Sequence, residues 1–313
     1  MVYRFWAVLY GAAFFCAALP LSARDIAVIT SQNAGAVTLV DPADGSVLVT
    51  VPMPGKPAAV AVDRQGRSYV VAVDTALLHV LGPDGGTIRQ IALPGAPFGV
   101  AVNPISRMIY VSDWEGTQIH EVDSEAGLIL RSFQTGAAPS GIAVTPDGQM
   151  IVTADRDANQ ISLIDAASGE AQTVAVGEHP FGVSIYDGRA FVANVLADSV
   201  SVVDMVDRRV IATIPVGERP YAVAFAGGRG FVTNQYAESV TVFDAASYAV
   251  LTTIMVGEYP EGIAATADET RVLVANWFSD TVSVIDVQTL TVVQDIDMPE
   301  GPRAFGAFIA AMP

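Results

Sequence analysis

The sequence has little cysteine, little histidine and little positive charge. Its single cysteine, Cys16, lies near the start, so residues 24–313 offer no disulfide, no thiolate nucleophile and no cysteine metal ligand. Acidic residues number 33 against 16 Lys plus Arg, and the formal net charge is −17. A chain so acidic repels phosphate backbones and anionic membrane surfaces. We therefore expect no nucleic-acid partner.

Residues 1–23 differ in composition from everything that follows. Arg4 precedes an almost wholly apolar run over residues 5–21, and small residues stand before residue 24. This pattern predicts a secretory signal peptide and hence a periplasmic or secreted protein, free of the membrane after cleavage. The alternative is an uncleaved membrane anchor, because the run is about long enough to span a bilayer with tilt, but Gly11 and Pro20 disfavour it.

Beyond residue 24 the chain consists of repeats. Residues 189–228 recur as 229–269, with Asn194 matched by Asn234 and Gly217 by Gly257 at an offset of 40 residues. One proline marks every unit, and the seven prolines are Pro57, Pro97, Pro139, Pro180, Pro220, Pro260 and Pro302.

Within each unit, apolar residues alternate over short runs separated by Asp, Gly and Pro, which indicates four β-strands per unit. Four strands in about 40 residues cannot bury both faces of their sheet and must stack on their neighbours. The sequence therefore predicts an all-β fold, a seven-bladed β-propeller of four-stranded antiparallel blades over residues 24–313.

Two segments of the repeat carry a family resemblance. The run of residues 231–234 (FVTN) and the run of residues 256–260 (VGEYP) resemble the YVTN-type β-propeller repeat of bacterial secreted and periplasmic proteins. The resemblance implies the same fold and an exported protein. It also implies a non-enzymatic binding or scaffold role, similar to accessory propellers of quinone-dependent dehydrogenase systems.

The order of strands within a unit predicts how the ring closes. A small residue follows each proline at the second position, as Gly182 follows Pro180, so this run is expected to be the innermost strand. The chain begins on a second-type strand at Asp25 and ends on a first-type strand over residues 303–310. The last strand should therefore complete the first blade, which removes two free sheet edges.

Residues that flank the prolines should meet at one mouth of the channel, because loops on a rigid frame are where binding residues gather. The opposite end carries tight turns, and we expect no pocket there. The candidate binding residues are Lys56, Phe98, Arg156, His179, Phe181, Arg219, Tyr221, Tyr259, Glu261, Trp277 and Arg303. Trp114, Arg156, Tyr236, Trp277 and Phe278 are expected to form an outer wall.

This set predicts either a pocket for a small anionic or aromatic ligand or a docking face for a protein partner in the cell envelope. The alternative is that these are variable loop residues whose charges neighbouring glutamates neutralise.

No catalytic residue, metal ligand or cofactor is predicted. His79 and His120 occupy a third-strand position that is polar in every unit, and the repeated Asn and Asp residues are expected to fix local turns. The alternative function is a lactonase-like or lyase-like propeller enzyme, for which only Glu261 and His179 offer acid–base groups near the mouth. Whether the chain is an enzyme stays open, with a non-enzymatic role favoured.

Overall fold

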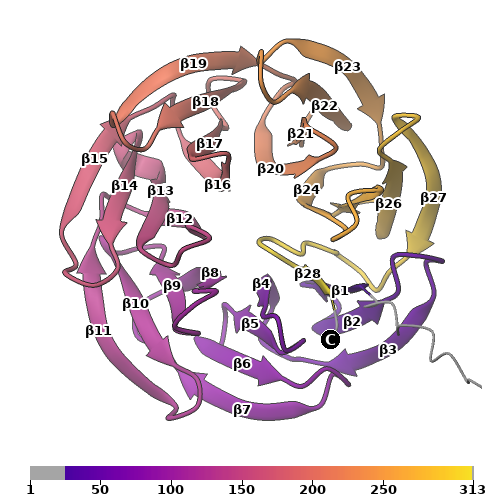
Figure 1. Ribbon diagram of the computed structural model, residues 1–313. Coiled ribbons are helices and arrows are strands. Elements are labelled where there is room, and N and C mark those ends of the chain that lie inside the picture. The colour runs from indigo at the N-terminus through magenta and orange to yellow at the C-terminus, as the bar shows by residue number, and fades with distance from the viewer. Residues whose placement is uncertain (1–24, 312–313) are drawn as a thin grey trace, which may run out of the picture.

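The computed structural model describes residues 25–311, which form a closed ring of seven sheets with four antiparallel strands each (Figure 1). This confirms the predicted seven-bladed β-propeller. The signal peptide expected over residues 1–23 lies outside the described residues. Within residues 25–311 no helix has the length and apolarity to cross a membrane.

The strands follow the predicted order from the channel outward. The inner strands are β4 (Pro57–Val62), β8 (Pro97–Val102), β12 (Pro139–Val144), β16 (Pro180–Tyr186), β20 (Pro220–Ala226), β24 (Pro260–Ala265) and β28 (Ile309–Ala311). The second strands are β1 (Asp25–Ser31), β5 (Ser68–Ala72), β9 (Ile109–Asp113), β13 (Met150–Asp155), β17 (Arg189–Asn194), β21 (Arg229–Asn234) and β25 (Arg271–Asn276).

The third strands are β2 (Ala36–Val40), β6 (Leu77–Leu81), β10 (Gln118–Asp123), β14 (Gln160–Asp165), β18 (Ser199–Asp204), β22 (Ser239–Asp244) and β26 (Thr281–Asp286). The outer strands are β3 (Val47–Pro52), β7 (Thr87–Ala92), β11 (Leu128–Gln134), β15 (Ala171–Ala175), β19 (Arg209–Pro215), β23 (Val250–Met255) and β27 (Thr291–Asp297). A short 3-10 helix, η1 (Arg156–Ala158), follows β13.

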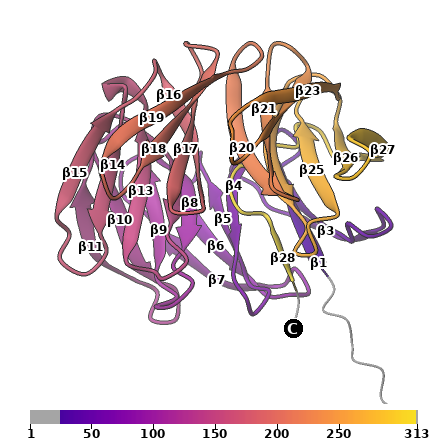
Figure 2. The same ribbon diagram turned by 45° about the horizontal axis from the view of Figure 1, so that its top comes forward.

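The core lies between the faces of neighbouring blades, which stand side by side around the axis (Figure 2). Phe191 of β17 is fully buried and packs with Val223 and Phe243 of the next blade. Burial of a side chain of this size contributes about 2–3 kcal/mol. Each sheet therefore gains most of its stability from the blade beside it.

Glycine near the start of an inner strand is required by close contact with the next blade. A Cβ on Gly182 would lie 2.4 Å from the carbonyl oxygen of Tyr221, and one on Gly141 would lie 2.5 Å from that of Phe181. No side chain fits at such distances. The small residue after each proline, which the sequence places on the innermost strand, is explained by this approach.

Ring closure is confirmed, although the closing segment differs from the prediction. Only Ile309–Ala311 forms a regular strand beside β1, with Ala27 paired to Ile309. The prediction of a regular strand over residues 303–310 is wrong for its first part. We number the blades in chain order, from β28, β1, β2 and β3 as blade 1 and β4–β7 as blade 2 to β24–β27 as blade 7. In this first part the backbone crosses to blade 2, where Val60 and Val62 donate N–H bonds to the carbonyls of Phe305 and Ala307.

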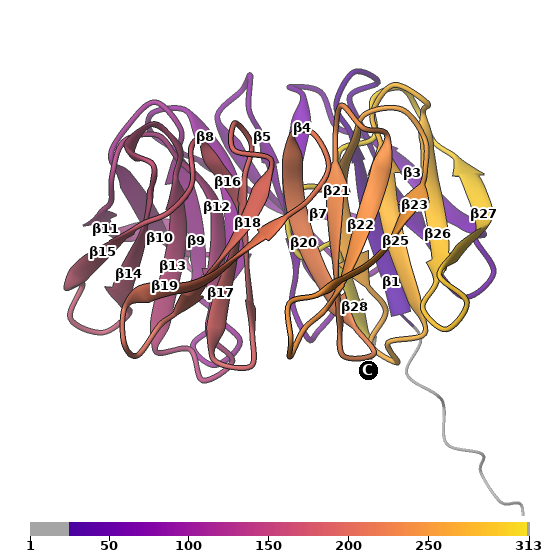
Figure 3. The same cartoon turned by 90° about the horizontal axis from the view of Figure 1, so that it is seen from above.

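The reason for the crossing is local. Gly306 has φ +116°, and a Cβ on it would lie 2.5 Å from the Val60 carbonyl oxygen, so only glycine allows the segment to enter the channel this closely. Residues 303–308 therefore bond to blades 1, 2 and 7 before β28 begins. Both ends of the described chain lie at the bottom of Figure 3, on the face opposite the mouth.

The recurrent polar residues have the structural roles that were expected. The Asn234 amide donates to the hydroxyls of Ser239 and Thr241 and accepts a bond from the Gly217 N–H. Asp204, at the end of β18, accepts bonds from two backbone N–H groups of the turn that follows. Each side chain therefore fixes a turn.

Blade 2 departs from this pattern. Ala72 is paired with Pro57 at the position where blades 3–7 have Asn or Asp and blade 1 has Ser31, and Gly82 replaces the turn aspartate.

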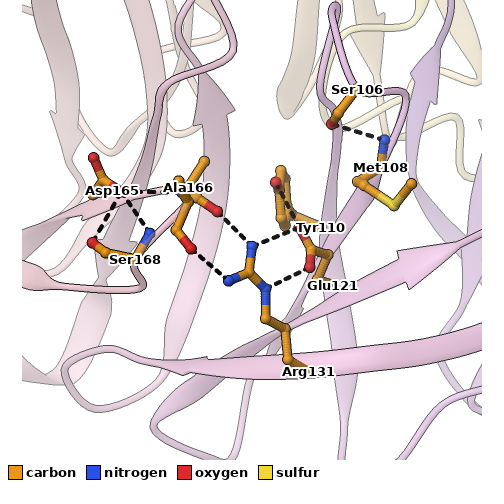
Figure 4. A network of polar contacts seen from close by, with 9 residues as sticks. Ser106, Met108, Tyr110, Glu121, Arg131, Asp165, Ala166 and Ser168 are labelled. Carbon is orange, nitrogen blue, oxygen red and sulfur yellow. Dashed lines mark hydrogen bonds and ion pairs between the residues drawn. The ribbon is translucent and has the colours of Figure 1, made fainter.

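Arginine side chains connect neighbouring blades by donating to carbonyls of the turn that follows a third strand. Arg131 of β11 forms an ion pair with Glu121, 2.6 Å from Nε to Oε2, and its Nη atoms donate to the carbonyls of Ala166 and Ala167 in the next blade (Figure 4). Tyr110 donates its hydroxyl to the same carboxylate at 3.0 Å. Arg271 caps the equivalent turn of blade 1 through the Pro42 carbonyl. These contacts fix the angle between blades.

Candidate functional site

The mouth of the ring is a rigid frame, because its two sets of links bond to each other. In blade 6, Gln235 N–H donates to the Arg219 carbonyl at 2.9 Å, and Tyr236 N–H donates to that of Glu218 at 3.3 Å. The same first bond recurs in the other blades, as Gln32 to Gly301, Val73 to Lys56, Trp114 to Ala96, Arg156 to Ala138, Val195 to His179 and Trp277 to Tyr259. Side chains on these links are therefore held in fixed places.

The residue before each proline takes a left-handed backbone in six of the seven units. These residues are Lys56, Ala138, His179, Arg219, Tyr259 and Gly301, with φ between 54° and 72°. Such a conformation is uncommon for residues other than glycine. It turns the chain from the outer strand of one blade into the inner strand of the next.

Three of the residues that directly follow a proline close the channel at the mouth. Phe98, Phe181 and Tyr221 pack with Phe305, which comes from the closing segment. The Phe181 ring lies 4.2 Å from that of Tyr221 and 5.1 Å from that of Phe305. We call these four rings the aromatic plug. The sequence-based interpretation placed Phe98, Phe181 and Tyr221 around a pocket; the structure buries Phe181 and Tyr221 in the aromatic plug, while Phe98 both packs there and lines a pocket on the mouth.

An ion pair lies beside the aromatic plug. Arg303 Nε is 2.9 Å from Glu261 Oε2, and the side chains are 16% and 4% exposed. Arg303 also donates through Nη1 to Gln32 Oε1 at 3.0 Å and through Nη2 to the Tyr221 hydroxyl. Gln235 donates to Glu261 Oε1 at 2.8 Å. Side chains from four parts of the chain thus converge on one charge pair.

Burial determines the proton affinity of this group. It raises the pKa of Glu261 to about 7, while the charge of Arg303 and the Gln235 hydrogen bond act in the opposite direction. Burial also raises the pKa of the Tyr221 hydroxyl. For Arg303, burial acts to lower the pKa, but the nearby Glu261 carboxylate outweighs it and the net shift is upward. Glu261 is therefore the group here that titrates near neutral pH.

A small pocket opens beside the ion pair on the mouth. It has a volume of about 250 Å³ and is lined by Gln32, Val73, Ala96, Pro97, Phe98, Trp114 and Arg303. We call it the mouth pocket. Trp114 packs on Phe98 with ring centroids 4.7 Å apart, and the Arg156 guanidinium lies 3.9 Å from the Trp114 ring centroid. Trp114 thus faces the centre and is not part of an outer wall.

On the other side of the mouth, aromatic rings are exposed. The ring of Tyr259 lies 5.6 Å from that of Tyr236 and 4.8 Å from that of Phe278. Tyr236 is 53% exposed and Phe278 is 62% exposed. The Arg219 guanidinium lies 5.3 Å from the Tyr236 ring. We call Tyr236, Tyr259 and Phe278 the aromatic row.

The structure brings together some of the predicted site residues and separates others. Phe98, Phe181, Tyr221, Glu261, Trp277 and Arg303 form one centre, where the Arg303 guanidinium lies 5.2 Å from the Trp277 ring. Lys56 lies apart and pairs with Asp74 at 3.3 Å.

His179 is also separate from the central ion pair, because it lies on the link between blades 4 and 5, whereas Glu261 lies on β24 of blade 7. Burial lowers the pKa of His179, and the charge of Arg156 acts in the same direction. Among residues 25–311 no hydrogen bond or ion pair joins the His179 and Glu261 side chains, so their acid–base pairing has no geometric support.

Two central residues were missed by the sequence analysis. Gln32 and Gln235 both stand one position after the end of a second strand, the position that Trp114, Arg156 and Trp277 occupy in other blades. This shared position in the repeat could have identified both glutamines. It did not, because a glutamine at a strand end indicates no particular chemistry until its partner is known.

His79 and His120 point to neighbouring strands. His120 Nδ1 bonds Ser132 Oγ at 2.8 Å, and His79 Nδ1 lies 3.5 Å from Gln90 Nε2. Burial lowers the pKa of both rings. Among residues 25–311 no three His, Cys, Asp or Glu side chains come together as a metal site would require.

The channel itself holds a larger cavity of about 430 Å³, although no pocket was expected away from the mouth. It is lined by the later residues of the inner strands and ends at Phe305 and Gly306. The expectation was wrong because it considered only the turns at that end, while the cavity is formed by the strands. Its side chains are nearly all aliphatic.

The fold and site define a seven-bladed β-propeller with a closed, charged mouth. No family model matches the chain, and a search of curated proteins finds no match. The structure is similar to a functionally unknown protein from Desulfotomaculum acetoxidans, with a TM-score of 0.78 and 14% identity over 92% of this chain and 98% of that one.

Two other similar structures have assigned activities. Hydrazine synthase from Kuenenia stuttgartiensis gives a TM-score of 0.72 and 16% identity over 80% of this chain and 89% of that one. Virginiamycin B lyase from Staphylococcus aureus gives 0.69 and 16% over 81% and 92%. At these identities the likeness shows the fold alone.

Proposed function

We propose that this chain is an exported, non-enzymatic binding propeller whose mouth docks a basic protein of the cell envelope. The observation that carries the proposal is the aromatic row, in which Tyr236 and Phe278 stay more than half exposed on links that are hydrogen-bonded in place. Exposed, preorganised aromatic side chains are typical of the hot spots of protein interfaces.

The charge around the row favours a basic partner. Glu238 and Glu258 are exposed on the links that carry Tyr236 and Tyr259, and Glu218 is exposed on the neighbouring link, where its carbonyl accepts the Tyr236 N–H. The whole chain carries a formal charge of −17. Lysine and arginine side chains of a partner could contact both the carboxylates and the faces of the rings. Attraction of this kind accelerates encounter and weakens as salt rises, since the screening length is about 8 Å at physiological ionic strength.

The resemblance to YVTN-type repeats supports a cellular location for this protein and a class of partner. Under this proposal the protein is periplasmic or secreted and accompanies a quinone-dependent oxidoreductase system. A basic electron-carrying cytochrome has the charge that the mouth requires. The carboxylates would attract its positive surface, and the aromatic row would provide the desolvated contact.

The test compares capture by the wild type and by a variant of the aromatic row. The full chain is immobilised and exposed to native envelope extract at low salt, beside Tyr236→Ala/Phe278→Ala and a control, Leu251→Ala, whose side chain is exposed on an outer strand. We expect the double variant to lose a basic protein that the wild type and the control retain and that salt releases. Equal capture by all three, or capture unaffected by salt, would contradict the proposal.

One observation favours the alternative of a lactonase-like or lyase-like enzyme. Glu261 has a pKa raised to about 7 and lies in the same cluster as the Tyr221 hydroxyl, which is the environment of a general acid or base. A screen for lactone hydrolysis and for lyase activity, with and without Ca²⁺ or Mg²⁺, distinguishes the two functions. The binding proposal predicts no turnover, and turnover abolished by Glu261→Gln would replace it.

A further inference from the structure

The mouth pocket has hydrogen-bond donors and apolar walls, and the proposed protein partner docks elsewhere on the mouth. It lies between blades 1, 2 and 3, whereas the aromatic row lies on blades 6 and 7. We propose that this pocket binds a small planar aromatic carboxylic acid, whose carboxylate contacts Arg303 and Gln32 and whose ring packs against Phe98 and Trp114.

Arg303 has donors to spare for such a ligand. A guanidinium carries five N–H donors, and the hydrogen bonds to Gln32 and Tyr221 use one on each Nη atom, while Nε contacts Glu261 as an ion pair without hydrogen-bond geometry. One hydrogen therefore remains on each of the two Nη atoms. Because Arg303 lines the pocket, these donors can reach a carboxylate there. Two parallel N–H bonds to one carboxylate are the strongest contact that an arginine makes.

Gln32 supplies a further donor. Its Oε1 accepts from Arg303, and among residues 25–311 no acceptor receives the hydrogens of its Nε2. The residue is 8% exposed and lines the mouth pocket. The bond to Arg303 fixes which end of the amide faces the guanidinium. It thereby leaves the donor end available to the ligand.

The walls set the shape of the ligand. Val73, Pro97, Phe98 and Trp114 give an apolar lining, and Arg156 covers part of the Trp114 ring. A volume of about 250 Å³ is below that of sites for drug-sized molecules, so it suits one or two fused rings. Among the residues that line the pocket, Arg303 is the one charged side chain, which favours an acid over a base.

Charge balance links ligand binding to a proton. Arg303 and Glu261 are a neutral pair, so a bound carboxylate would leave a net negative charge in a buried place. Protonation of Glu261 restores neutrality. The titratable groups that face Glu261 are Arg303, Tyr221 and Tyr259, and burial raises the pKa of both tyrosines, so Glu261 is the group that takes up the proton.

The experiment uses naphthoate as the probe and neutral naphthylmethanol of the same shape as its control. Calorimetric titration of the full chain should show saturable binding of naphthoate, at least about tenfold tighter than naphthylmethanol, because charged hydrogen bonds contribute about 1.5–3 kcal/mol. At about pH 8, titrations in two buffers of different ionisation enthalpy should show proton uptake, which falls toward zero at about pH 6 where Glu261 is already protonated.

Three variants complete the test. Gln32→Leu should weaken naphthoate binding at least about tenfold and should leave the ion pair of Arg303 and Glu261 in place. Glu261→Gln should abolish proton uptake, and Ile88→Ala, whose exposed side chain lies on an outer strand of blade 2, should bind as the wild type does.

Equal binding of the acid and the alcohol, or unchanged binding by Gln32→Leu, would overturn the proposal. Binding without proton uptake at about pH 8 would overturn the coupling to Glu261. Because the readout is a small molecule at the mouth pocket, failure here leaves the docking of a protein partner untouched, and failure of the pull-down leaves this site untouched.

Discussion

Replacing Arg131 by alanine should measure how much one arginine stabilises the ring through its ion pair within one blade and its hydrogen bonds to the next. Arg131 donates to Glu121 and to two carbonyls of the next blade, and its guanidinium lies 4.5 Å from the Phe133 ring (Figure 4). Without it, the Glu121 carboxylate keeps the hydrogen bond from the Tyr110 hydroxyl but loses its ion pair, while its side chain is 7% exposed.

The magnitude follows from burial. Breaking a fully buried ion pair costs about 3–5 kcal/mol, because the remaining charge stays buried without its partner. Arg131 is 40% exposed, so water replaces part of what is lost and we expect a loss of about 2 kcal/mol in the free energy of unfolding. The matched control is Arg209→Ala, where the ion pair to Asp207 spans 3.4 Å and the side chain is 64% exposed.

The assay is equilibrium unfolding in urea. Arg131→Ala should lower the midpoint clearly, whereas Arg209→Ala should change the stability by less than about 0.5 kcal/mol. A double-mutant cycle with Glu121→Gln should give a coupling energy of about 1 kcal/mol or more. Equally mild effects of Arg131→Ala and Arg209→Ala would show that the bonds of Arg131 do not stabilise the ring, and a zero coupling would show that its ion pair with Glu121 contributes nothing.

Three further predictions concern the centre and closure of the ring. Gly182→Ala should destabilise by about 1–3 kcal/mol, because the added Cβ meets the Tyr221 carbonyl at 2.4 Å; an unchanged urea midpoint would show that the inner strands can move apart. Deleting residues 303–313 removes the buried rings of Phe305 and Phe308 and should abolish cooperative thermal unfolding, so a truncated chain with the wild-type melting temperature would contradict the closure. For Glu261 the folded pKa of about 7 lies above the ordinary value of 4.5, so its contribution to stability is present at low pH and lost as pH rises toward 7. Unfolding midpoints across that range should fall less steeply in Glu261→Gln than in the wild type and in the exposed control Glu258→Gln.

Much of the fold could be predicted from the sequence because its spacing is regular. Six of the seven prolines begin the inner strand of a blade, Pro302 precedes the closing segment, and strand order inside a repeat follows from alternation and turn residues. What failed was the stretch before β28. Its path depends on Gly306 lying against Val60, a contact between residues far apart in the chain, and no local pattern records it.

The site was predicted only as a set of positions. The sequence placed the residues after each proline at the mouth, but it could not show that several of them fill the channel as the aromatic plug. The sequence also could not show the contact between Gln32 and Arg303, because the two residues lie at opposite ends of the chain and meet only when the ring closes. The repeat period predicts which residues reach the mouth, whereas which side chains contact each other depends on how the ring closes.

The ion pair at the mouth is hard to explain by stability. Two of the seven positions after the prolines carry charge, in Glu261 and Arg303, while Phe98 and Phe181 show that apolar rings fit the same ring of positions. A buried ion pair is often no more stabilising than apolar residues of similar size, and replacing one can even stabilise by about 1–4 kcal/mol. The charges therefore favour an interpretation in terms of recognition, in which their cost in desolvation is offset by a bound partner.

Closure and recognition depend on the same segment. Residues 303–308 bond to blades 1, 2 and 7 to close the ring, and the first of them is Arg303, which supplies the charge of the mouth pocket. A ligand that contacts Arg303 can bind only while this segment is in place, so its binding energy adds to the stability of the closed ring. The chain thus places the central cation, Arg303, on the segment that closes the ring, and the binding site exists only once the ring is complete.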